Sequence, residues 1–387
     1  MKAVVLVAGE GTRLRPLTRS RPKPMLPVAN RPLLEHVVES VHEAGIDEFV
    51  FVVGYERERI QNHFGDGDQW DIDIEYAVQE KQLGTGHALL QAEPYVDGAF
   101  VALNGDRIVD PSAVTRVVET RRTVENSVMA VTRVDDPADY GVVAFEGERA
   151  VSITEKPPAH GVTTNVINAG IYGLDRSMFD DLRGAEADGE LGITTPLRAH
   201  AARGDLETVR FDGLWLDVSH LWDLISVNGT VLDRFEGERA PSASVHRDAT
   251  VVGPVALGAD VRVRPNATVL PGTALGNNVD IGANAVVSNA VVMPDARIGD
   301  GAVLRDCIVG ENAAVGPNTT IEGGEADVVV DGVVHEDVRL GGVVGDNSDI
   351  GGAVTVEPGS VLGNGTRVES GSTVDGTIED DATVRRG

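Results

Sequence analysis

The sequence predicts an α/β domain with a mostly parallel sheet, followed by a parallel β-helix of hexapeptide repeats. In residues 1–235, short valine-rich apolar runs alternate with helical patterns, which is typical of a Rossmann-like sheet covered on both faces. After about residue 240, aliphatic residues recur every six positions, and this is the period of a parallel β-helix. We therefore expect one domain over residues 1–235 and a second over residues 241–387.

The elements of the first domain follow from their apolar patterns. Residues 2–8 are a valine-rich run that stops at Gly9 and fits a buried strand. Residues 33–44 place apolar side chains on one helical face, and Gly45 is a natural C-cap. Further buried strands are expected at 48–54, 73–78 and 99–106. Because the first strand leads into a glycine-rich stretch, that stretch should lie at the carboxyl edge of the sheet, where open α/β folds bind ligands.

The second domain is indicated by a ladder of aliphatic residues that stack inward. A five-residue step replaces the usual six after Val287 and again after Leu304, and residues 325–342 interrupt the array. We expect the interruption to be a loop that protrudes from the helix. The ladder consists of Val245, Val251, Leu257, Val263, Val269, Leu275, Ile281, Val287, Val292, Ile298, Leu304, Val309, Val315, Ile321, Val344, Ile350, Val356, Leu362, Val368 and Val374.

The composition is strongly acidic, with a formal net charge of -28 and few lysines among the basic residues. This bias resembles that of an extreme halophile and describes the solvation of the whole surface, so nucleic acid is not expected as a partner. Where lysine is avoided, Lys23 and Lys156 become candidates for positions that need a compact ammonium. No apolar run approaches the ~20 residues of a membrane span, and the N-terminus lacks a signal peptide. We expect a soluble, cytoplasmic protein with no membrane partner.

The single cysteine, Cys307, excludes an internal disulfide and offers no metal-ligand cluster. We interpret it as a small buried apolar side chain.

The stretch GEGTRLRPLTRSRPKPM, residues 9–25, concentrates positive charge in this acidic chain. It fits neither the dinucleotide fingerprint nor the P-loop. Lys23 stands between Pro22 and Pro24, which fix the backbone in advance and aim a flexible lysine at low entropic cost. A glycine turn followed by Arg13 and Lys23 suits the polyphosphate of a nucleoside triphosphate. The remaining arginines, Arg15, Arg19 and Arg21, are expected to solvate the loop or to guide anions toward it.

The same stretch resembles the defining motif of the sugar-1-phosphate nucleotidylyltransferases. Further pieces occur in that family's order across nearly the whole first domain, and the β-helix behind it is similar to the left-handed β-helix of the bifunctional enzymes that make UDP-N-acetylglucosamine and of their archaeal relatives. The pieces are VQEKQLGTGHAL (78–89), LNGD (103–106), YGVV (140–143), TEKP (154–157), INAGIYGL (167–174) and WLDVSHLWDLISVN (215–228). The acidic bias would place such a protein among the haloarchaea.

The resemblance implies a nucleoside triphosphate, UTP or dTTP, and a sugar 1-phosphate as substrates, with Mg²⁺ as cofactor. Charge on the triphosphate, on the leaving pyrophosphate and on the sugar phosphate would be neutralised by Arg13, Lys23 and Lys156. The nucleotide would be bound by Ala8, Gly9, Gly11, Gln79, Gly84 and Thr85. The sugar hydroxyls would be bound by Gly141, Glu155 and Asn168. The metal would be held by Asp106 and Asp217, since hard carboxylate oxygens suit Mg²⁺.

Several alternatives stay open at this stage. Glucose 1-phosphate and N-acetylglucosamine 1-phosphate both fit the implied sugar residues, and UTP and dTTP both fit Gln79. The bifunctional relatives use a β-helix histidine as acetyl-transfer base, but the matching segment 300–316 has none, which leaves His335 as the one substitute. A noncatalytic regulatory subunit is a further alternative. The resemblance also implies a homo-oligomer through the β-helix, a trimer in first place.

Overall fold

The computed structural model describes residues 1–162, 164–185 and 189–386. Its residue contacts form two compact units, and the loop that carries the basic stretch is divided between them. The first unit contains Met1–Glu10, Pro22–Met25 and Leu33–Leu216, and the second contains Gly11–Arg21, Leu26–Pro32 and Asp217–Gly387. These groups differ from the ranges 1–235 and 241–387, whose boundary stays a prediction.

The first unit is built on a mixed sheet with the strand order β10-β9-β11-β6-β1-β4-β5, in which β8 pairs with β11 and β12 with β8. Its centre is parallel, because β1 pairs in parallel with both β4 and β6. The strands of this sheet are β1 (Lys2–Val7), β4 (Glu48–Val53), β5 (Asp73–Val78), β6 (Phe100–Asn104), β8 (Ser127–Arg133), β9 (Gly141–Glu146), β10 (Arg149–Glu155), β11 (Val166–Leu174) and β12 (Leu206–Arg210). The short strands β7 (Arg107–Val109) and β13 (Trp215–Asp217) pair with each other in a separate sheet.

Helices cover both faces of this sheet, because the strands are apolar on both sides. One core contains Val5, Leu34 and Val114, and the other contains Val4, Leu89 and Phe179. The residues of β1 thus alternate between the two cores. Helices α1 (Leu33–Glu43), α2 (Arg57–Phe64) and α4 (Pro111–Thr123) contribute to the first core, and α3 (Thr85–Gln91), α5 (Ser177–Gly184) and α6 (Thr194–Arg203) to the second. The sheet and the expected elements of this domain are confirmed.

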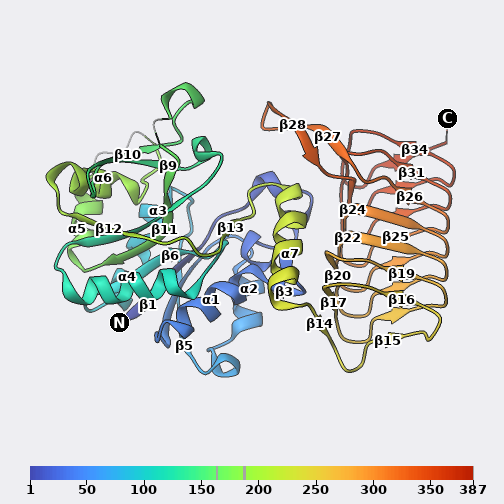
Figure 1. Cartoon of the computed structure of the whole chain (residues 1–387), viewed down its shortest axis with the longest axis horizontal. Coiled ribbons are helices and arrows are strands. Elements are labelled where there is room, and N and C mark those ends of the chain that lie inside the picture. Colours follow the sequence, from blue (N-terminus) through green and yellow to red (C-terminus); the bar gives the residue numbers. More distant parts are fainter. Residues whose placement is uncertain (163, 186–188, 387) are drawn as a thin grey trace. The chain divides into compact units, whose positions relative to one another are not determined.

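The second unit is a parallel β-helix, as predicted. Val245 pairs with Val263, and Val263 with Ile281, so these first coils advance by 18 residues each, or three hexapeptides. Figure 1 shows the strands, coloured yellow to red, stacked in successive coils. The ladder residues form one apolar core, with Val245 and Val251 partly buried at its end. Stacking equivalent side chains removes them from water on every coil, which is why a six-residue period suffices to specify the architecture.

Its strands fall into two stacks. One contains β14 (Glu238–Arg239), β16 (Thr250–Val251), β17 (Val255–Leu257), β19 (Thr268–Val269), β20 (Thr273–Leu275), β22 (Val286–Val292), β24 (Val303–Val309), β26 (Thr320–Ile321), β29 (Gly342–Val344), β31 (Thr355–Val356), β32 (Ser360–Leu362), β34 (Thr373–Val374) and β35 (Thr377–Ile378). The other contains β15 (Ser244–Val245), β18 (Arg262–Val263), β21 (Asp280–Ile281), β23 (Arg297–Ile298), β25 (Ala314–Val315), β30 (Asp349–Ile350), β33 (Arg367–Val368) and β36 (Thr383–Val384).

The five-residue steps have a structural explanation. Where the sixth residue is missing, two short strands merge into the longer β22 and β24. Asn289 and Asp306 lie in the middle of these strands with φ of 47° and 48°, a left-handed conformation that Asn and Asp tolerate better than most residues. The Asn289 amide donates to Asp306 Oδ1 at 2.6 Å. The corner is therefore turned by one residue, and the ladder stays in register.

The expected loop at 325–342 is a β-hairpin of β27 (Glu325–Val330) and β28 (Val333–Arg339). It projects from the coils in Figure 1. Runs of valine on either side of Asp331 and Gly332 allow these segments to pair with each other, and Asp331 and Gly332 turn between them with positive φ. The interruption expected at 325–342 is present, and its chain forms a paired hairpin within the protruding segment.

Helix α7 (Leu221–Phe235) and the short strands β2 (Pro27–Val28) and β3 (Arg31–Pro32) complete the second unit. Leu232 of α7 packs against Ala256 and Ala274 of the β-helix. Asn228 is fully buried; its Oδ1 accepts from Ala29 N at 2.9 Å, and its Nδ2 donates to Gly272 O at 2.8 Å. The helix is thereby fixed to the coils by apolar packing and by one buried amide. Among the described residues, no helix is long and apolar enough to cross a membrane.

Candidate functional site

The glycine-rich loop leaves the sheet at the carboxyl end of β1, as predicted. Ala8 is buried, and its carbonyl accepts a hydrogen bond from Gln82 Nε2 at 3.0 Å. Gly9 has open space where a side chain would begin. Gly11 has a φ of 63°, so the turn favours glycine at this position. Thr18 Oγ1 donates to Gly11 O at 2.8 Å and closes the loop on itself.

Lys23 and Asp106, two of the predicted site residues, meet in the first unit. Lys23 Nζ lies 2.7 Å from Asp106 Oδ2, and their side chains are 13% and 31% exposed. Asp106 follows β6, next to β1 at the centre of the parallel part of the sheet. A lysine and a carboxylate that both retain access to solvent at this edge can each contact a bound phosphate or its counterion.

Gln79, Gly84 and Thr85 also come together in the first unit. Gln79 is buried after β5, and its Nε2 donates to Gly84 O at 3.3 Å. A side chain on Gly84, which has a φ of 98°, would lie 2.4 Å from Leu191 O, so only glycine fits. Thr85 Oγ1 accepts from Ile193 N at 3.1 Å. Gln79 Nε2 also lies 2.9 Å from His87 Nδ1. These contacts fix the orientation of the amide, and His87 is a residue that sequence reasoning missed.

The three predicted sugar residues are neighbours on β9, β10 and β11. Gly141 is paired with Glu155 across β9 and β10. A Cβ added to Gly141 would lie 3.0 Å from Glu155 Oε2 and 3.5 Å from Asn168 Cβ. Asn168 is buried, its Oδ1 accepts from Gly170 N at 3.0 Å, and its Nδ2 donates to Tyr172 Oη at 2.8 Å. The glycine leaves room for a ligand where a larger residue would touch both polar side chains.

Burial raises the pKa of Tyr172 to about 12, and the hydrogen bond from Asn168 opposes this effect. The phenol is therefore neutral at physiological pH and accepts from Asn168 without carrying charge. Lys156, next to Glu155, has a φ of 40°, a costly conformation for a residue other than glycine. Its amide donates to Tyr140 O at 3.0 Å, and the side chain is exposed. The backbone holds the lysine at the end of β10 while its ammonium stays in solvent.

An arginine that contacts two aromatic rings stands beside this group and was missed by the sequence analysis. The guanidinium carbon of Arg107 lies 5.7 Å from the Tyr140 ring centroid and 5.1 Å from that of Trp215, within cation–π range. The Trp215 indole donates to Ala169 O at 2.9 Å. The signal was present in the sequence, since Tyr140 and Trp215 begin two of the quoted motifs and Arg107 directly follows Asp106.

Arg13 lies in the second unit, and its surroundings are acidic. Its Nε is 3.1 Å from Asp331 Oδ2, at the tip of the β27–β28 hairpin, and both side chains are exposed. An exposed pair of this kind contributes little stability, about 0–1 kcal/mol, so an anionic ligand can replace Asp331 at low cost.

The expectation for the other loop arginines is wrong for Arg21, which does not solvate the loop. Arg21 is buried and pairs with Asp346 at 2.7 Å and with Glu311 at 2.8 Å. Arg19 pairs with Asp380 at 2.6 Å. Both therefore bind β-helix carboxylates. The sequence pattern gave no sign of these partners, which lie about 300 residues further along the chain.

Asp217 begins the second unit and accepts a hydrogen bond from Ser219 Oγ at 2.7 Å. Among the described residues, no group of three or more histidine, cysteine or acidic side chains is arranged to hold a metal. A Mg²⁺ ion is commonly bound through one or two carboxylates and completes its shell with water and substrate phosphate. Asp106, a partly exposed carboxylate that already contacts the ammonium of Lys23, has the donor chemistry for such an ion.

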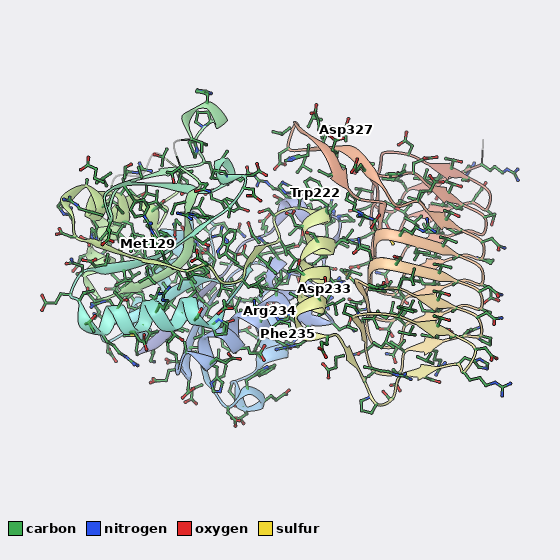
Figure 2. The ribbon with its side chains drawn as sticks, viewed as in Figure 1. Met129, Trp222, Asp233, Arg234, Phe235 and Asp327 are labelled. Carbon is green, nitrogen blue, oxygen red and sulfur yellow. The ribbon has the colours of Figure 1, made fainter. Side chains whose placement is uncertain are left out.

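His335, the candidate acetyl-transfer base, lies on β28 and belongs to an aromatic cluster. Its ring centroid is 4.8 Å from that of His220 and 5.1 Å from that of Trp222, and the His220 and Trp222 rings are stacked. Trp222, labelled in Figure 2, lies on α7. These contacts give His335 a structural role, because its ring packs the hairpin against α7.

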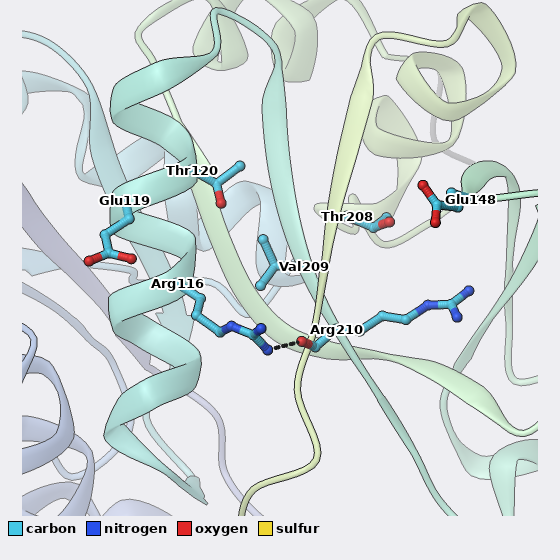
Figure 3. A pocket seen from close by; sticks show the side chains of 7 residues that line it. All are labelled: Arg116, Glu119, Thr120, Glu148, Thr208, Val209 and Arg210. Carbon is cyan, nitrogen blue, oxygen red and sulfur yellow. Dashed lines mark hydrogen bonds between the residues drawn. The ribbon is translucent and has the colours of Figure 1, made fainter.

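A separate pocket of about 450 Å³ opens between α4 and β12 in the first unit (Figure 3). It is lined by Arg116, Glu119 and Thr120 of α4, by Thr208 and Arg210 of β12, and by Glu148. Arg116 donates to the carbonyl of Arg210. None of these residues belongs to the predicted site, and the pocket's charges of opposite sign balance each other.

Comparison with known proteins identifies two families along the chain. The family described as nucleotidyl transferase matches residues 2–234, and the family described as GMPPB C-terminal domain matches residues 251–342. The bifunctional protein GlmU of Methanococcus maripaludis is 32% identical, over 99% of this chain and 97% of the relative. The low-salt glycan biosynthesis nucleotidyltransferase Agl11 of Haloferax volcanii is 31% identical, over 90% of this chain and 99% of the relative.

A glucose-1-phosphate thymidylyltransferase of Streptomyces antibioticus is 30% identical, over 84% of this chain and 86% of the relative. Among solved structures, a Bacillus anthracis protein assigned as a glucose-1-phosphate thymidylyltransferase, in complex with sucrose, superposes with a TM-score of 0.57 at 28% identity. That match covers 62% of this chain and all of the other. The resemblance and the fold class drawn from the sequence are thereby confirmed.

Proposed function

The chain belongs to the nucleotidyl transferase family, and on this premise we propose that it joins UTP or dTTP to glucose 1-phosphate or N-acetylglucosamine 1-phosphate, with release of pyrophosphate. A relative named as a glucose-1-phosphate thymidylyltransferase supports this reaction class. The observation that carries the proposal is the Lys23–Asp106 pair at the carboxyl edge of the parallel strands. It provides a mobile ammonium and a hard carboxylate where a triphosphate would bind.

The reaction needs no nucleophile from the protein. An oxygen of the sugar phosphate forms a bond to the α-phosphorus of the triphosphate, while the bond from that phosphorus to the bridging oxygen breaks and pyrophosphate leaves with the electron pair. Catalysis then consists of positioning the two substrates and of neutralising charge. Lys23 is proposed to neutralise the triphosphate and the leaving pyrophosphate together with Arg13, and Lys156 the attacking sugar phosphate.

Mg²⁺ is proposed as the cofactor, with Asp106 and Asp217 as its protein ligands. When bound, the ion would supply further positive charge to the phosphate oxygens. Asp106 fits this role because it combines partial exposure with a carboxylate that accepts a cationic partner. The main chain of Ala8, Gly9 and Gly11 is proposed to contact base and phosphate, because these backbone groups stand at the end of β1.

Gln79, with Gly84 and Thr85, is proposed to contact the base. The internal hydrogen bonds of Gln79 support this role, since an amide held in one orientation can bind a pyrimidine edge without losing side-chain freedom. Gly141, Glu155 and Asn168 are proposed to bind the sugar hydroxyls, and their mutual contact on three neighbouring strands supports one shared subsite.

A panel of nucleoside triphosphates and sugar 1-phosphates, assayed for pyrophosphate release with Mg²⁺ in high salt, tests the proposal. Release with UTP or dTTP and one of the two named sugar phosphates is the expected result. Absence of release from every pair would contradict the proposal and favour the noncatalytic regulatory subunit instead.

Acetyl transfer to glucosamine 1-phosphate is a second candidate activity, because the bifunctional protein GlmU matches over nearly the full length of this chain. Against it stands the position of His335, whose ring packs against Trp222 and His220. Release of coenzyme A from acetyl-CoA in the presence of glucosamine 1-phosphate decides this point, and loss of that release in His335→Ala would assign the base. The proposed homo-oligomer, a trimer in first place, is checked by light scattering of the whole chain.

A further inference from the structure

One corner of the β-helix carries a ladder of polar side chains on successive coils. Glu311 N donates to Asp346 Oδ1 at 2.8 Å, Asp346 N donates to Asn364 Oδ1 at 2.8 Å, and Asn364 N donates to Asp380 Oδ1 at 2.9 Å. We call Glu311, Asp346, Asn364 and Asp380 the polar corner. At this corner the backbone of each coil donates to a side chain of the next coil, and these bonds make the corner a rigid surface.

Residues 11–21 of the glycine-rich loop lie along this polar corner. Asn364 Nδ2 donates to Pro16 O at 3.1 Å, and Ser20 Oγ donates to Asp346 Oδ2 at 2.7 Å. Arg19 Nε contacts Asp380 Oδ2 at 2.6 Å. The loop thus contacts several successive coils, and each contact uses a side chain of the corner.

Arg21 makes the most buried of these contacts. The side chains of Arg21 and Asp346 are only 7% and 5% exposed, and Arg21 Nη2 lies 2.7 Å from Asp346 Oδ2. The same nitrogen is 2.8 Å from Glu311 Oε2, and Nη1 contacts the thioether sulfur of Met293. Desolvated charges persist only where geometry and hydrogen bonds compensate them, and removal of one partner leaves the other charge uncompensated. Such a pair fixes the position of the segment that carries it.

That segment includes Gly11 and Arg13, for which we propose contacts with the triphosphate. Thr18 Oγ1 donates to Gly11 O at 2.8 Å, so the front of the loop is connected to the part held by the corner. A loop fixed at Thr18 and Arg21 loses little freedom when a ligand binds to Gly11 and Arg13.

We propose that Arg21 and Asp346 are a positioning pair for nucleotidyl transfer, so that the β-helix holds the phosphate-binding loop in its working conformation. This inference rests on the proposed function. It assigns the β-helix a part in the reaction at the glycine-rich loop, besides any oligomerisation or acetyl transfer. Arg21 acts through the loop and is not itself a group that touches substrate.

The variant Asp346→Asn tests the pair, because asparagine keeps the shape and the acceptor for Glu311 N but removes the charge. We expect kcat/KM for the triphosphate to fall about 100-fold, since a displacement of about 1 Å can cost that much. The KM for the sugar phosphate should stay unchanged, because Gly141, Glu155 and Asn168 lie on other strands. A general loss of folded protein would lower the yield of active enzyme, but it would not change the KM for the triphosphate while leaving the KM for the sugar phosphate unchanged.

Asp380→Asn is the matched control, because its partner Arg19 belongs to the same loop and the same corner but the pair is exposed. An exposed pair is worth about 0–1 kcal/mol, so its kcat/KM should fall less than about fivefold. If Asp346→Asn does not fold, Arg21→Lys replaces it, because lysine keeps Asp346 compensated and loses only the fork geometry. An intermediate loss of kcat/KM is then expected.

Hydrogen exchange of residues 11–21, followed without substrates, separates this inference from the proposed function. We expect these amides to be protected in the parent and in Asp380→Asn and to exchange faster in Asp346→Asn. Equal protection in all three proteins, or equal kcat/KM in Asp346→Asn and the parent, would overturn the positioning role. Failure of the parent itself to release pyrophosphate would overturn the proposed function, while the exchange data would still decide whether the pair holds the loop.

Discussion

Two ion pairs, one in each unit, are formed by cations only two residues apart in the sequence, and the pairs differ in their exposure to solvent. Lys23 contacts Asp106 in the first unit, and Arg21 contacts Asp346 in the second, both at 2.7 Å. The first pair is partly exposed, at 13% and 31%, whereas the second is nearly closed to solvent. An accessible pair can exchange its partner for a ligand, and a buried pair cannot without a large desolvation cost.

The accessible cation is a lysine and the buried cation is an arginine, and the chemistry of each side chain suits its position. An ammonium is a compact point charge on a flexible stem, which suits a contact that changes during a reaction. A guanidinium fork contacts several acceptors at once, and Arg21 does so with Asp346, Glu311 and Met293. The comparison teaches that one basic loop combines an accessible cation with a cation that is buried against the fold, and that only the first can exchange its partner.

The largest expected effect is at Asp106, on the accessible side of the comparison. Asp106→Ala removes a carboxylate proposed to hold Mg²⁺, and we expect kcat for pyrophosphate release to fall about 10²- to 10³-fold, as for loss of one preorganised electrostatic contact. Asp212→Asn, at an exposed acid of the same unit, is the control and should keep the parent rate. A parent rate in Asp106→Ala at saturating Mg²⁺ would show the metal assignment to be wrong.

Lys23 should give the next largest effect. In Lys23→Ala the proposed charge on the leaving pyrophosphate is lost, and we expect a decrease of about 10²-fold in kcat. Lys23→Arg keeps the charge but brings a larger planar group into contact with Asp106, so we expect it to recover only part of the rate. Steady-state kinetics of both variants measures these effects. Full activity in either variant would contradict the role proposed for the Lys23 ammonium.

A smaller effect, on stability alone, is expected at Asn228 in the second unit. Asn228→Ala leaves the buried groups Ala29 N and Gly272 O without their partner, which costs about 1–3 kcal/mol in the free energy of unfolding. Denaturant unfolding measures this loss. Thr230→Ala, at an exposed site one helical half-turn away, serves as control. An unchanged stability in Asn228→Ala would refute the role of the amide in fixing α7.

Cys307 is expected to play no part in activity, but its burial should clearly lower the reactivity of its thiol. Burial raises the pKa of the Cys307 thiol well above its usual value, with the neighbouring Asp306 acting in the same direction. The folded state therefore favours the neutral thiol. Its contribution to stability is complete below the unfolded pKa and decreases as the pH rises above that value. A thiol reagent at mildly alkaline pH should react slowly with the native protein and rapidly after unfolding, whereas an exposed cysteine in Thr250→Cys should react at once.

The elements of the fold were accessible to sequence reasoning because their signals are local. The apolar run of β1, the helical face that begins at Leu33 and the six-residue ladder each specify burial within a few residues. Every ladder residue packs in the β-helix core. The pairing of residues 325–339 as a hairpin was missed because these residues break the six-residue period, although valine runs on either side of Asp331 and Gly332 indicate two strands and a turn.

The site was predictable to the extent that motifs name its residues, and among these residues Lys23 contacts Asp106 and Gly141 lies beside Glu155 and Asn168. Their roles stay predictions until kinetics tests them. Arg107 was missed although Tyr140 and Trp215 stood in quoted motifs, because cation–π contacts of one guanidinium with two rings have no fixed sequence spacing.

By itself, the sequence determined the α/β sheet, the β-helix and the position of the basic loop at the end of β1, because periodicity and glycine placement act over short distances along the chain. Only the tertiary structure decided which arginines of that loop stay exposed and which are buried against the β-helix. The partner of Arg21 is Asp346, and only folding shows that both charges are withdrawn from water. Burial is a property of the packed molecule, so no local pattern distinguishes Arg21 from Arg13.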